Sequence, residues 1–590
     1  MKRIFLWMTL GVVILMASCQ SEPVKVTVVA TSDLETSLFS HDYKYSMESR
    51  GGAALVADYL SELKATVGEQ NVIYVDNGDL LVGWPLNYYM KNIEKSDTTL
   101  AAAAMNALGC EVYGIGEGDI AQGKALLDRH VKSSKGAPVC ANLVDAKSGE
   151  PIYKPYVVVE RNGMKIAFLG LITEWADKYM NKNSMDGMKV VNAVEAAQKW
   201  MTEIQKNEKP DVVIGLFHMG ASAVSKRTNS REDIAVTVVS NVAGFDAVVC
   251  GHDGLRRSKE VVAADGRKVT IASPGRRGMY AIDITITAQR SGESFKNKMV
   301  DVAIKTMISR SFNKEYATAM RPLLSDLRKA MAEPIAKLKS NVAAVDAIFG
   351  SSAYMDLIHK VQLQNSGADL SFAHLYALIN GSAAGDISLL DVNGFFAGRG
   401  KLYTIKMKGR EVLDMLTYSV SRFYSTVKDK DDKLLKYSDD KSRLAEGCKV
   451  LETVAGIRYN VYMNKQKRED KVKILGLTNG RPFDLDKEYT VAVAEDYVMS
   501  TNLSLNIGAK VKSKELVNRI VAVSEKDMTE LVCDYLKEAG SFDIKPSNNW
   551  SLQPAAWVKN IKENEMKSLT QIYFPQSASI ELDPMAEAVK

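Results

Sequence analysis

The sequence predicts a layered α/β protein with two domains. Its 590 residues exceed what one hydrophobic core usually holds. Between about residues 24 and 304, short β-branched runs alternate with helix-like stretches, which is typical of a layered α/β or α/β/α domain. Polar residues with metal-binding side chains come directly after or at the end of four of these runs, as expected at the carboxyl edge of an open α/β sheet.

The alternation assigns the elements of the first domain in order. Strands are expected at residues 25–30, 71–75, 165–169, 211–217, 246–250 and 269–271. Helices are expected at residues 53–65, 98–108 and 192–206. Residues 313–339 are rich in Glu, Ala, Lys, Leu and Met and predict a connecting helix, with Pro322 and Pro334 bounding or kinking its turns.

The whole chain divides into five predicted parts. They are a signal peptide at residues 1–19, a first domain at 20–310, a connecting helix at 311–340, a mixed α+β domain at 341–558 and a tail at 559–590. The last part is predicted to be a tail because it lacks clear periodicity.

The first residues have the composition of an export signal. Lys2 and Arg3 precede an apolar run, residues 4–15, which is too short to span a bilayer. Cys19 follows small residues, as in the lipobox of a bacterial lipoprotein, and predicts a lipid anchor that tethers the chain to a membrane. The alternative is an ordinary cleaved signal in which the cysteine is incidental. The predicted location is the bacterial cell envelope, either periplasmic or exposed at the surface.

Composition sets limits on the class of partner. There are 76 basic and 71 acidic residues, and this balanced surface predicts no nucleic-acid partner. Beyond Cys19 the cysteines are widely separated and form no CxxC pair, so neither a zinc ribbon nor a disulfide framework is indicated.

Four residues at strand ends form a candidate metal site. Asp33 and Asp79 follow two predicted strands, His218 ends a third and His252 follows a fourth. Carboxylate and imidazole groups bind divalent metals such as Mn²⁺, Mg²⁺, Ca²⁺ or Zn²⁺. The alternative is a vestigial site in which these polar groups hydrogen-bond one another.

Ordered fragments along residues 24–557 resemble the bacterial 5'-nucleotidase superfamily, and the second-domain fragments are most similar to 2',3'-cyclic-nucleotide phosphodiesterase/nucleotidases. Representative fragments are ATSD at 30–33, NGD at 77–79, HMG at 218–220, GH at 251–252, GADLSF at 367–372, AGIRY at 455–459 and NGRPF at 479–483. The resemblance implies a four-layer calcineurin-like metallophosphoesterase β-sandwich flanked by helices, followed by a 5'-nucleotidase C-terminal domain.

The resemblance also implies a chemistry and shows where this chain departs from it. The family uses two metals about 4 Å apart to hydrolyse phosphoesters. Asp33, Asp79, His218 and His252 match the family's ligands. Glu35 replaces a ligand His, Glu117 replaces a ligand Asn, and Gly118 replaces the catalytic His. The expected metal residues are therefore Asp33, Glu35, Asp79, Glu117, His218 and His252, with no catalytic residue assigned.

The replacements predict weak catalysis. Two added carboxylates favour a cation and oppose an anionic phosphoester. The missing His removes a donor that is worth about 10²–10⁴-fold in rate.

In the second domain, Leu451 stands at a usual aromatic position. Arg458, Tyr459 and Tyr497 remain as candidate substrate-binding residues, although half-buried strand tyrosines and a surface salt bridge are the alternatives.

Two functional hypotheses follow. The first is an exported lipoprotein with weak or lost nucleotide phosphoester hydrolysis and a residual metal- or ligand-binding role, alone or with envelope protein partners. The second is an active, divergent metal-dependent nucleotidase or phosphodiesterase with a carboxylate-rich site.

Overall fold

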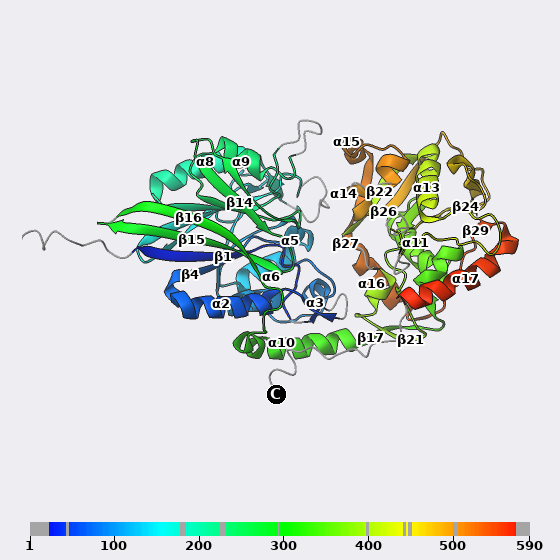
Figure 1. Cartoon of the computed structure of the whole chain (residues 1–590), viewed down its shortest axis with the longest axis horizontal. Helices are drawn as coiled ribbons and strands as arrows, with labels where there is room; N and C mark the ends of the chain where they lie inside the picture. Colours follow the sequence, from blue (N-terminus) through cyan, green and yellow to red (C-terminus); the bar gives the residue numbers. More distant parts are fainter. Residues whose placement is uncertain are drawn as a thin grey trace, which may run out of the picture.

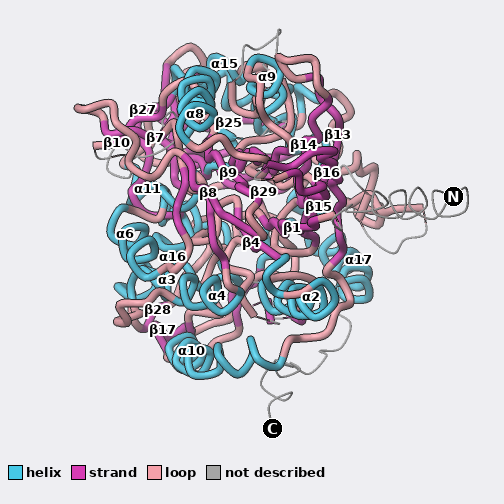
Figure 2. The backbone as a smooth tube through the Cα atoms, turned by 90° about the vertical axis from the view of Figure 1, so that its left-hand side faces the viewer, coloured by secondary structure: helices cyan, strands magenta, loops and turns pink. Residues whose placement is uncertain are grey.

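Two six-stranded sheets lie at the centre of the first domain (Figures 1 and 2). The first has the order β16 (Ser294–Thr306), β15 (Tyr280–Ser291), β1 (Val24–Thr31), β4 (Val72–Asp76), β5 (Cys110–Gly114) and β6 (Ala137–Val139). The second has the order β13 (Arg256–Val262), β14 (Lys268–Pro274), β12 (Ala247–Cys250), β11 (Val212–His218), β9 (Met164–Ile172) and β8 (Tyr156–Arg161). The six strands expected from the sequence are confirmed within these sheets.

The structure is a computed structural model. It describes residues 23–39, 41–42, 47–176, 185, 187–223, 231–292, 294–396, 400–439, 444–445, 451–499 and 504–573. The predicted signal peptide and the predicted lipidation at Cys19 lie outside these residues. No helix within the described part of the chain is both long and apolar enough to cross a membrane.

Alternation along the buried strands builds a four-layer sandwich. Val26, Val28 and Ala30 of β1 pack in the core between the two sheets, whereas Val29 faces the helices outside the first sheet. That outer layer contains α2 (Ala53–Val67), α4 (Leu100–Leu108), α6 (Lys124–Ser133) and α10 (Lys314–Ala332). On the far side, α8 (Ala193–Asn207) and α9 (Ala235–Asn241) cover the second sheet (Figure 2). The predicted layered α/β class is confirmed.

The carboxyl ends of the inner strands meet at one edge of the sandwich. Strands β1, β4, β5 and β6 run parallel in the first sheet, and β9, β11, β12 and β14 run parallel in the second. The loops that follow parallel strands emerge at the same edge, so residues far apart in sequence are brought together there.

The second domain is built on a five-stranded sheet with the order β23 (Glu452–Ala455), β19 (Leu370–His374), β26 (Glu488–Ala494), β22 (Lys401–Lys408) and β27 (Ile520–Asp527). Helices α11 (Ala353–Ser366), α13 (Gly409–Phe423) and α16 (Met528–Ala539) pack on it. The domain also contains two three-stranded sheets. They are β25 (Val472–Leu477), β24 (Ile457–Tyr462) and β29 (Trp550–Gln553), and β21 (Gly385–Ser388), β17 (Pro334–Leu338) and β28 (Ser541–Phe542).

The connecting helix and the tail differ from their predicted bounds. Helix α10 ends at Ala332, and β17 already belongs to a sheet of the second domain, seven residues before the predicted start at 341. The predicted tail is helical as far as Tyr573, in α17 (Ala555–Tyr573). Its buried stripe combines Ile561 and Leu569 with Glu565, and this acidic member conceals the apolar periodicity in the sequence.

Glu565 is buried because its carboxylate has partners. It accepts hydrogen bonds from the backbone N–H groups of Leu434 and Leu435 and from the Tyr437 hydroxyl. These bonds fasten α17 to the second domain.

The two domains share a packed interface. Trp84 and Tyr88, beside and within α3 (Leu86–Asn92), belong to the hydrophobic core of the second domain. Lys537 donates to the Tyr88 hydroxyl at 2.6 Å, and Lys91 pairs with buried Glu530 at 3.1 Å. The interface therefore combines apolar burial with partly buried polar contacts.

Candidate metal centre between the two sheets

Five predicted metal residues meet at the shared edge of the two sheets. Asp33 and Asp79 follow β1 and β4, and Glu117 opens the short helix α5 (Glu117–Ala121) after β5. From the second sheet, His218 ends β11 and His252 follows β12. Their ligand atoms form two groups suited to a cation, Glu117 with His218 and His252, and Asp33 with Asp79 and His218.

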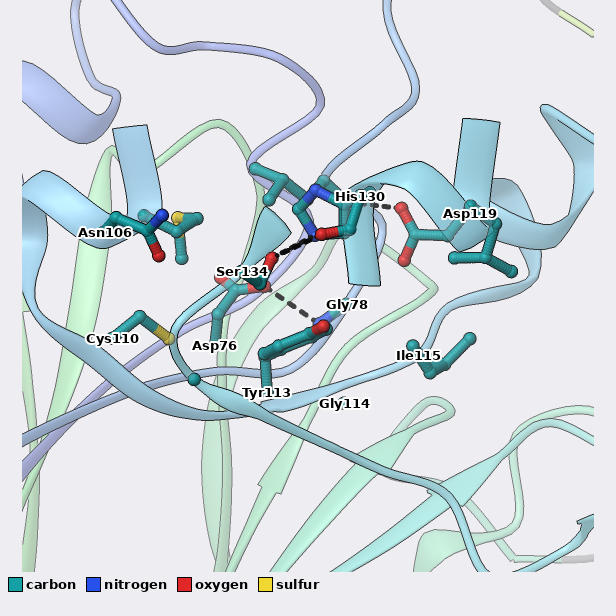
Figure 3. Close-up of a pocket in the computed structure, with 14 residues that line it drawn as sticks. Asp76, Gly78, Asn106, Cys110, Tyr113, Gly114, Ile115, Asp119, His130 and Ser134 are labelled. Carbon is teal, nitrogen blue, oxygen red and sulfur yellow. Dashed lines mark hydrogen bonds between the residues drawn. The ribbon is translucent and has the colours of Figure 1, made fainter. Parts of the chain in front are cut away.

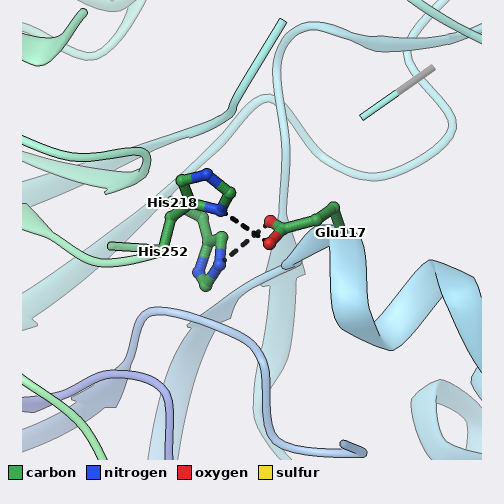
Figure 4. A group of neighbouring side chains, drawn as sticks. All are labelled: Glu117, His218 and His252. Atoms are coloured by element: carbon green, nitrogen blue, oxygen red, sulfur yellow. Dashed lines mark hydrogen bonds and ion pairs between the residues drawn. The ribbon is translucent and has the colours of Figure 1, made fainter. Parts of the chain in front are cut away.

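His218 is the member that the two groups share. Its Nε2 lies 3.1 Å from Glu117 Oε2, 3.5 Å from Asp79 Oδ2 and 4.0 Å from Asp33 Oδ1. Figure 4 shows the rings of His218 and His252 both facing the Glu117 carboxylate. His252 Nδ1 lies 2.6 Å from Glu117 Oε1.

The backbone at the site is in an uncommon conformation. Asp33, Glu35, Asp79 and His252 have positive φ angles of 52°, 47°, 57° and 71°. Non-glycine residues rarely adopt this region, and when they do they cluster at functional sites. The strand-end turns thus orient these side chains at an energetic cost that the surrounding sheets offset.

One hydrogen bond of the His218 ring determines which of its nitrogens can bind a metal. Nδ1 lies 2.7 Å from the Asn77 carbonyl oxygen, so it carries the proton and donates it. Nε2 is buried, and neither it nor Glu117 Oε2 has a hydrogen-bond partner among the described residues. A buried imidazole nitrogen and carboxylate oxygen that face each other in this way fit a divalent cation.

Burial and neighbouring charges shift the pKa values of the side chains at this site. Burial opposes charge on His218, but Asp79, Glu117 and Asp33 outweigh it and hold the pKa of His218 well above its usual value. Burial also opposes charge on Glu117, yet His252 and His218 hold the pKa of Glu117 well below its usual value. Burial raises the pKa of Asp33 to about 7.

A cavity of about 290 Å³ opens from this cluster toward the second domain. Its walls carry the carboxylates of Asp33, Glu35, Asp79, Glu117, Glu232, Asp253, Glu495 and Asp527. Among the described lining residues, Arg276 and Lys401 are the only lysine or arginine side chains. The cavity is therefore strongly acidic.

Parts of this chain are similar to known proteins. The family model of the 5'-nucleotidase C-terminal domain matches residues 334–503. A 2',3'-cyclic-nucleotide 2'-phosphodiesterase/3'-nucleotidase of Haemophilus influenzae is 21% identical, over 90% of this chain and 88% of its own length. A trifunctional nucleotide phosphoesterase of Bacillus subtilis is 23% identical over 90% of this chain, which spans only 39% of that protein's length.

Residues 334–503 therefore belong to the 5'-nucleotidase C-terminal domain family. Two solved structures share the fold of this chain. The NAD nucleotidase of Haemophilus influenzae has a TM-score of 0.56 at 17% identity, and it covers 90% of this chain and 99% of its own. A 5'-nucleotidase precursor of Thermus thermophilus has a TM-score of 0.53 at 18% identity with the same coverage.

Two acidic residues near the site, Glu35 and Asp119, do not belong to either ligand group. Glu35 lies on the cavity wall and belongs to neither ligand group, so its ligand role stays a prediction. Asp119 accepts hydrogen bonds from the backbone N–H groups of Asp79, Leu80, Leu81 and Gly116, and so it caps a turn.

Glu232 is a further acidic residue at the site that the sequence does not point to. Its Oε1 lies 3.2 Å from His252 Nε2, on the side of the ring opposite Glu117. Glu232 precedes α9 outside any strand-end motif, so no spacing rule pointed to it.

A small closed cavity of about 10 Å³ lies behind the cluster, with room for a single water molecule. Figure 3 shows Asp76, Tyr113 and His130 around it. Burial lowers the pKa of His130 to about 4, so His130 is a neutral structural residue.

The three candidate substrate-binding residues of the second domain do not line the cavity between the domains. Tyr459 is buried and stacks on Trp550, with ring centroids 5.6 Å apart. Tyr497 is buried against Phe372 and His374. Arg458 lies on β24 at a separate groove of about 680 Å³. The substrate-binding role of these three residues stays a prediction.

Proposed function

We propose that this chain is a metal-binding member of the superfamily whose nucleotide phosphoester hydrolysis is weak or lost. The observation that carries the proposal is the packing of Gly118, the position of the family's catalytic histidine. A Cβ atom there would lie 2.3 Å from Val82 Cγ2 and 2.7 Å from Asp79 Oδ1. The turn is built around glycine, and no side chain fits without moving Asp79.

The Asp79 carboxylate is adapted to this glycine. The Gly118 N–H donates to Asp79 Oδ1 at 2.7 Å, which leaves Oδ2 facing His218. Asp119, which follows Gly118 in the sequence, is held by four backbone N–H groups and is not placed to transfer a proton.

The remaining residues fit a divalent cation. Asp33, Asp79, Glu117, His218 and His252 supply oxygen and imidazole ligands of the kind that Mn²⁺, Mg²⁺ or Zn²⁺ take. A bound cation supplies charge stabilisation for a phosphoryl group and lowers the pKa of bound water. The acidic walls of the cavity oppose the approach of an anionic phosphoester and thus favour binding over turnover.

One observation favours the alternative of an active, divergent hydrolase. His252 faces the cavity and contacts Glu117 and Glu232 through its two nitrogens. An imidazole held in this way can donate a proton to a leaving group if substrate enters. This second candidate assigns to His252 the role that position 118 no longer supplies.

The test separates binding from turnover. Calorimetry measures Mn²⁺ binding, and a panel of nucleotides and 2',3'-cyclic nucleotides measures phosphate release, for the wild-type chain, Asp79→Asn and the surface control Glu260→Gln. We expect Mn²⁺ binding that Asp79→Asn removes and Glu260→Gln retains, with phosphate release absent or far below the turnover of typical enzymes, about 1–10³ s⁻¹. Mn²⁺-dependent release within that range, abolished by Asp79→Asn, would establish the active alternative, and absence of Mn²⁺ binding would contradict both.

We further propose that the chain is exported and anchored by lipid at Cys19. The support is the sequence of the first residues, a basic pair, an apolar run and a cysteine after small residues. Incorporation of labelled palmitate in a bacterial host, lost in Cys19→Ala, is the expected result. Equal labelling of both chains would contradict it. The residual role then lies in the cell envelope, with a nucleotide, another phosphoester or an envelope protein as the ligand.

A further inference from the structure

Lys401 of the second domain reaches the helix that carries Glu117. It is the first residue of β22 and only 4% exposed. Its ammonium lies 2.7 Å from the Glu525 carbonyl oxygen, 3.2 Å from Asp527 Oδ1 and 3.1 Å from the carbonyl oxygen of Ala121 in the first domain. The ammonium thus donates two hydrogen bonds and forms one ion pair, and one of the hydrogen bonds crosses the domain boundary.

Ala121 is the last residue of α5, whose first residue is Glu117. Its carbonyl oxygen is one of those that a helix end leaves without an intrahelical partner. At the other end, the Gly118 N–H is held by Asp79. A helix of five residues held at both ends has little freedom, so a shift at Ala121 is carried to Glu117.

The backbone of Lys401 is itself fixed. Its N–H donates to Glu495 Oε2 at 2.6 Å, and a Cβ atom on neighbouring Gly400 would lie 2.1 Å from the same oxygen. The Met528 N–H in turn donates to the Gly400 carbonyl at 2.8 Å. The second domain therefore presents the ammonium in one position.

We propose that Lys401 is a positioning residue for Glu117, through which docking of the second domain sets the cation affinity of the first. The inference rests on the proposed metal binding and adds its regulation. Because Lys401 stabilises the arrangement of α5 in which Glu117 faces His218 and His252, cation binding and domain docking favour each other. By linkage, the coupling acts equally in both directions.

The test compares two interdomain lysines. Lys401→Met removes the ammonium at α5, whereas Lys537→Met removes one that contacts Tyr88 and leaves α5 untouched. Mn²⁺ affinity of the full detergent-solubilised chain is measured by calorimetry, with thermal unfolding of each variant. We expect Lys401→Met to weaken Mn²⁺ binding about tenfold, the size of effect seen for residues that orient metal ligands. Lys537→Met should stay within about twofold, even if both variants lose similar stability.

Each result bears on a different claim. Wild-type affinity in folded Lys401→Met, or an equal loss in Lys537→Met, overturns the positioning role and leaves the proposed metal binding intact. No Mn²⁺ binding by the wild-type chain overturns both. If Lys401→Met does not fold, Asp527→Asn is measured in its place, because it removes the negative charge that pairs with the Lys401 ammonium. It should lower Mn²⁺ affinity about threefold, and an unchanged affinity there overturns the inference.

Discussion

The first domain brings its predicted site residues together, whereas the second domain separates them. In the first domain the ligand atoms form two groups that each suit a cation and that share His218: Glu117 with His218 and His252, and Asp33 with Asp79 and His218. Tyr459 and Tyr497 are buried in the second domain, and Arg458 lies at another groove. The difference follows from where each residue lies in its element. Residues at the carboxyl ends of parallel strands share one edge. Arg458 and Tyr459 are neighbours within β24 and so point to different faces, and Tyr497 lies in the helix α14 (Glu495–Met499).

Removing His218 should produce the largest effect that tests this contrast. His218→Asn should weaken Mn²⁺ binding on the order of 100-fold or more, because residues that merely orient ligands already contribute about 10–100-fold. His374→Asn in the second domain, where the ring contacts Asp496, should leave Mn²⁺ affinity unchanged. Calorimetry on both variants checks the prediction, and a comparable loss in His374→Asn would remove the contrast between the domains.

Adding a methyl group at position 118 should destabilise the first domain. Gly118→Ala places a Cβ against Val82 and both Asp79 carboxylate oxygens, at a cost of about 1–3 kcal/mol typical of overpacking. Denaturant unfolding measures the change, and Val82→Ala should recover part of it because one of the close contacts is with Val82 Cγ2. A Gly118→Ala chain of wild-type stability would show that the turn is not built around glycine.

Each domain also contains a buried neutral histidine, and acid should destabilise both domains. Burial lowers the pKa of His130 to about 4 and that of His359 to about 3. Below a pH of about 6.5 the unfolded chain binds protons that the folded chain does not. Each histidine therefore stabilises the fold fully above that pH, and its contribution falls as the pH drops toward the folded pKa.

The expected size is about 2 kcal/mol per histidine between pH 6.5 and pH 5. Unfolding of the wild-type chain, His130→Gln and His359→Gln at both pH values measures it. The loss on acidification should be about 2 kcal/mol smaller in each variant than in the wild type, and carboxylates common to all three chains cancel. Identical pH dependence in all three would exclude buried neutral histidines.

The smallest effect is expected at Tyr459. Its hydroxyl makes one long contact, 3.4 Å from the Val454 backbone nitrogen, and its ring stacks on Trp550 away from the cavity between the domains. Tyr459→Phe should change neither Mn²⁺ affinity nor nucleotide affinity by more than about twofold. Equilibrium binding of AMP in the presence of Mn²⁺ checks this, and a larger loss of affinity would support the predicted substrate-binding role of Tyr459.

The fold could be predicted from sequence to the extent that local pattern encodes it. Strands such as β1 and β11 are nearly continuous apolar runs because both faces are buried, and this makes them visible. Strand β16 and helix α17 were missed for related reasons. The first is largely exposed and polar, and the second has Glu565 in its buried stripe.

By itself, the sequence determined the class of fold, the order of the domains and the ligand-bearing turns, since these depend on short-range pattern and on residues at strand ends. Only the tertiary structure decided that Gly118 is packed against Asp79, that Glu232 joins His252, and that Lys401 crosses the domain boundary to α5. These contacts join residues that are between 20 and 280 positions apart in the sequence, and none of these contacts pairs two strands of a sheet. No local periodicity in the sequence predicts them. They depend on how the two sheets and the two domains pack.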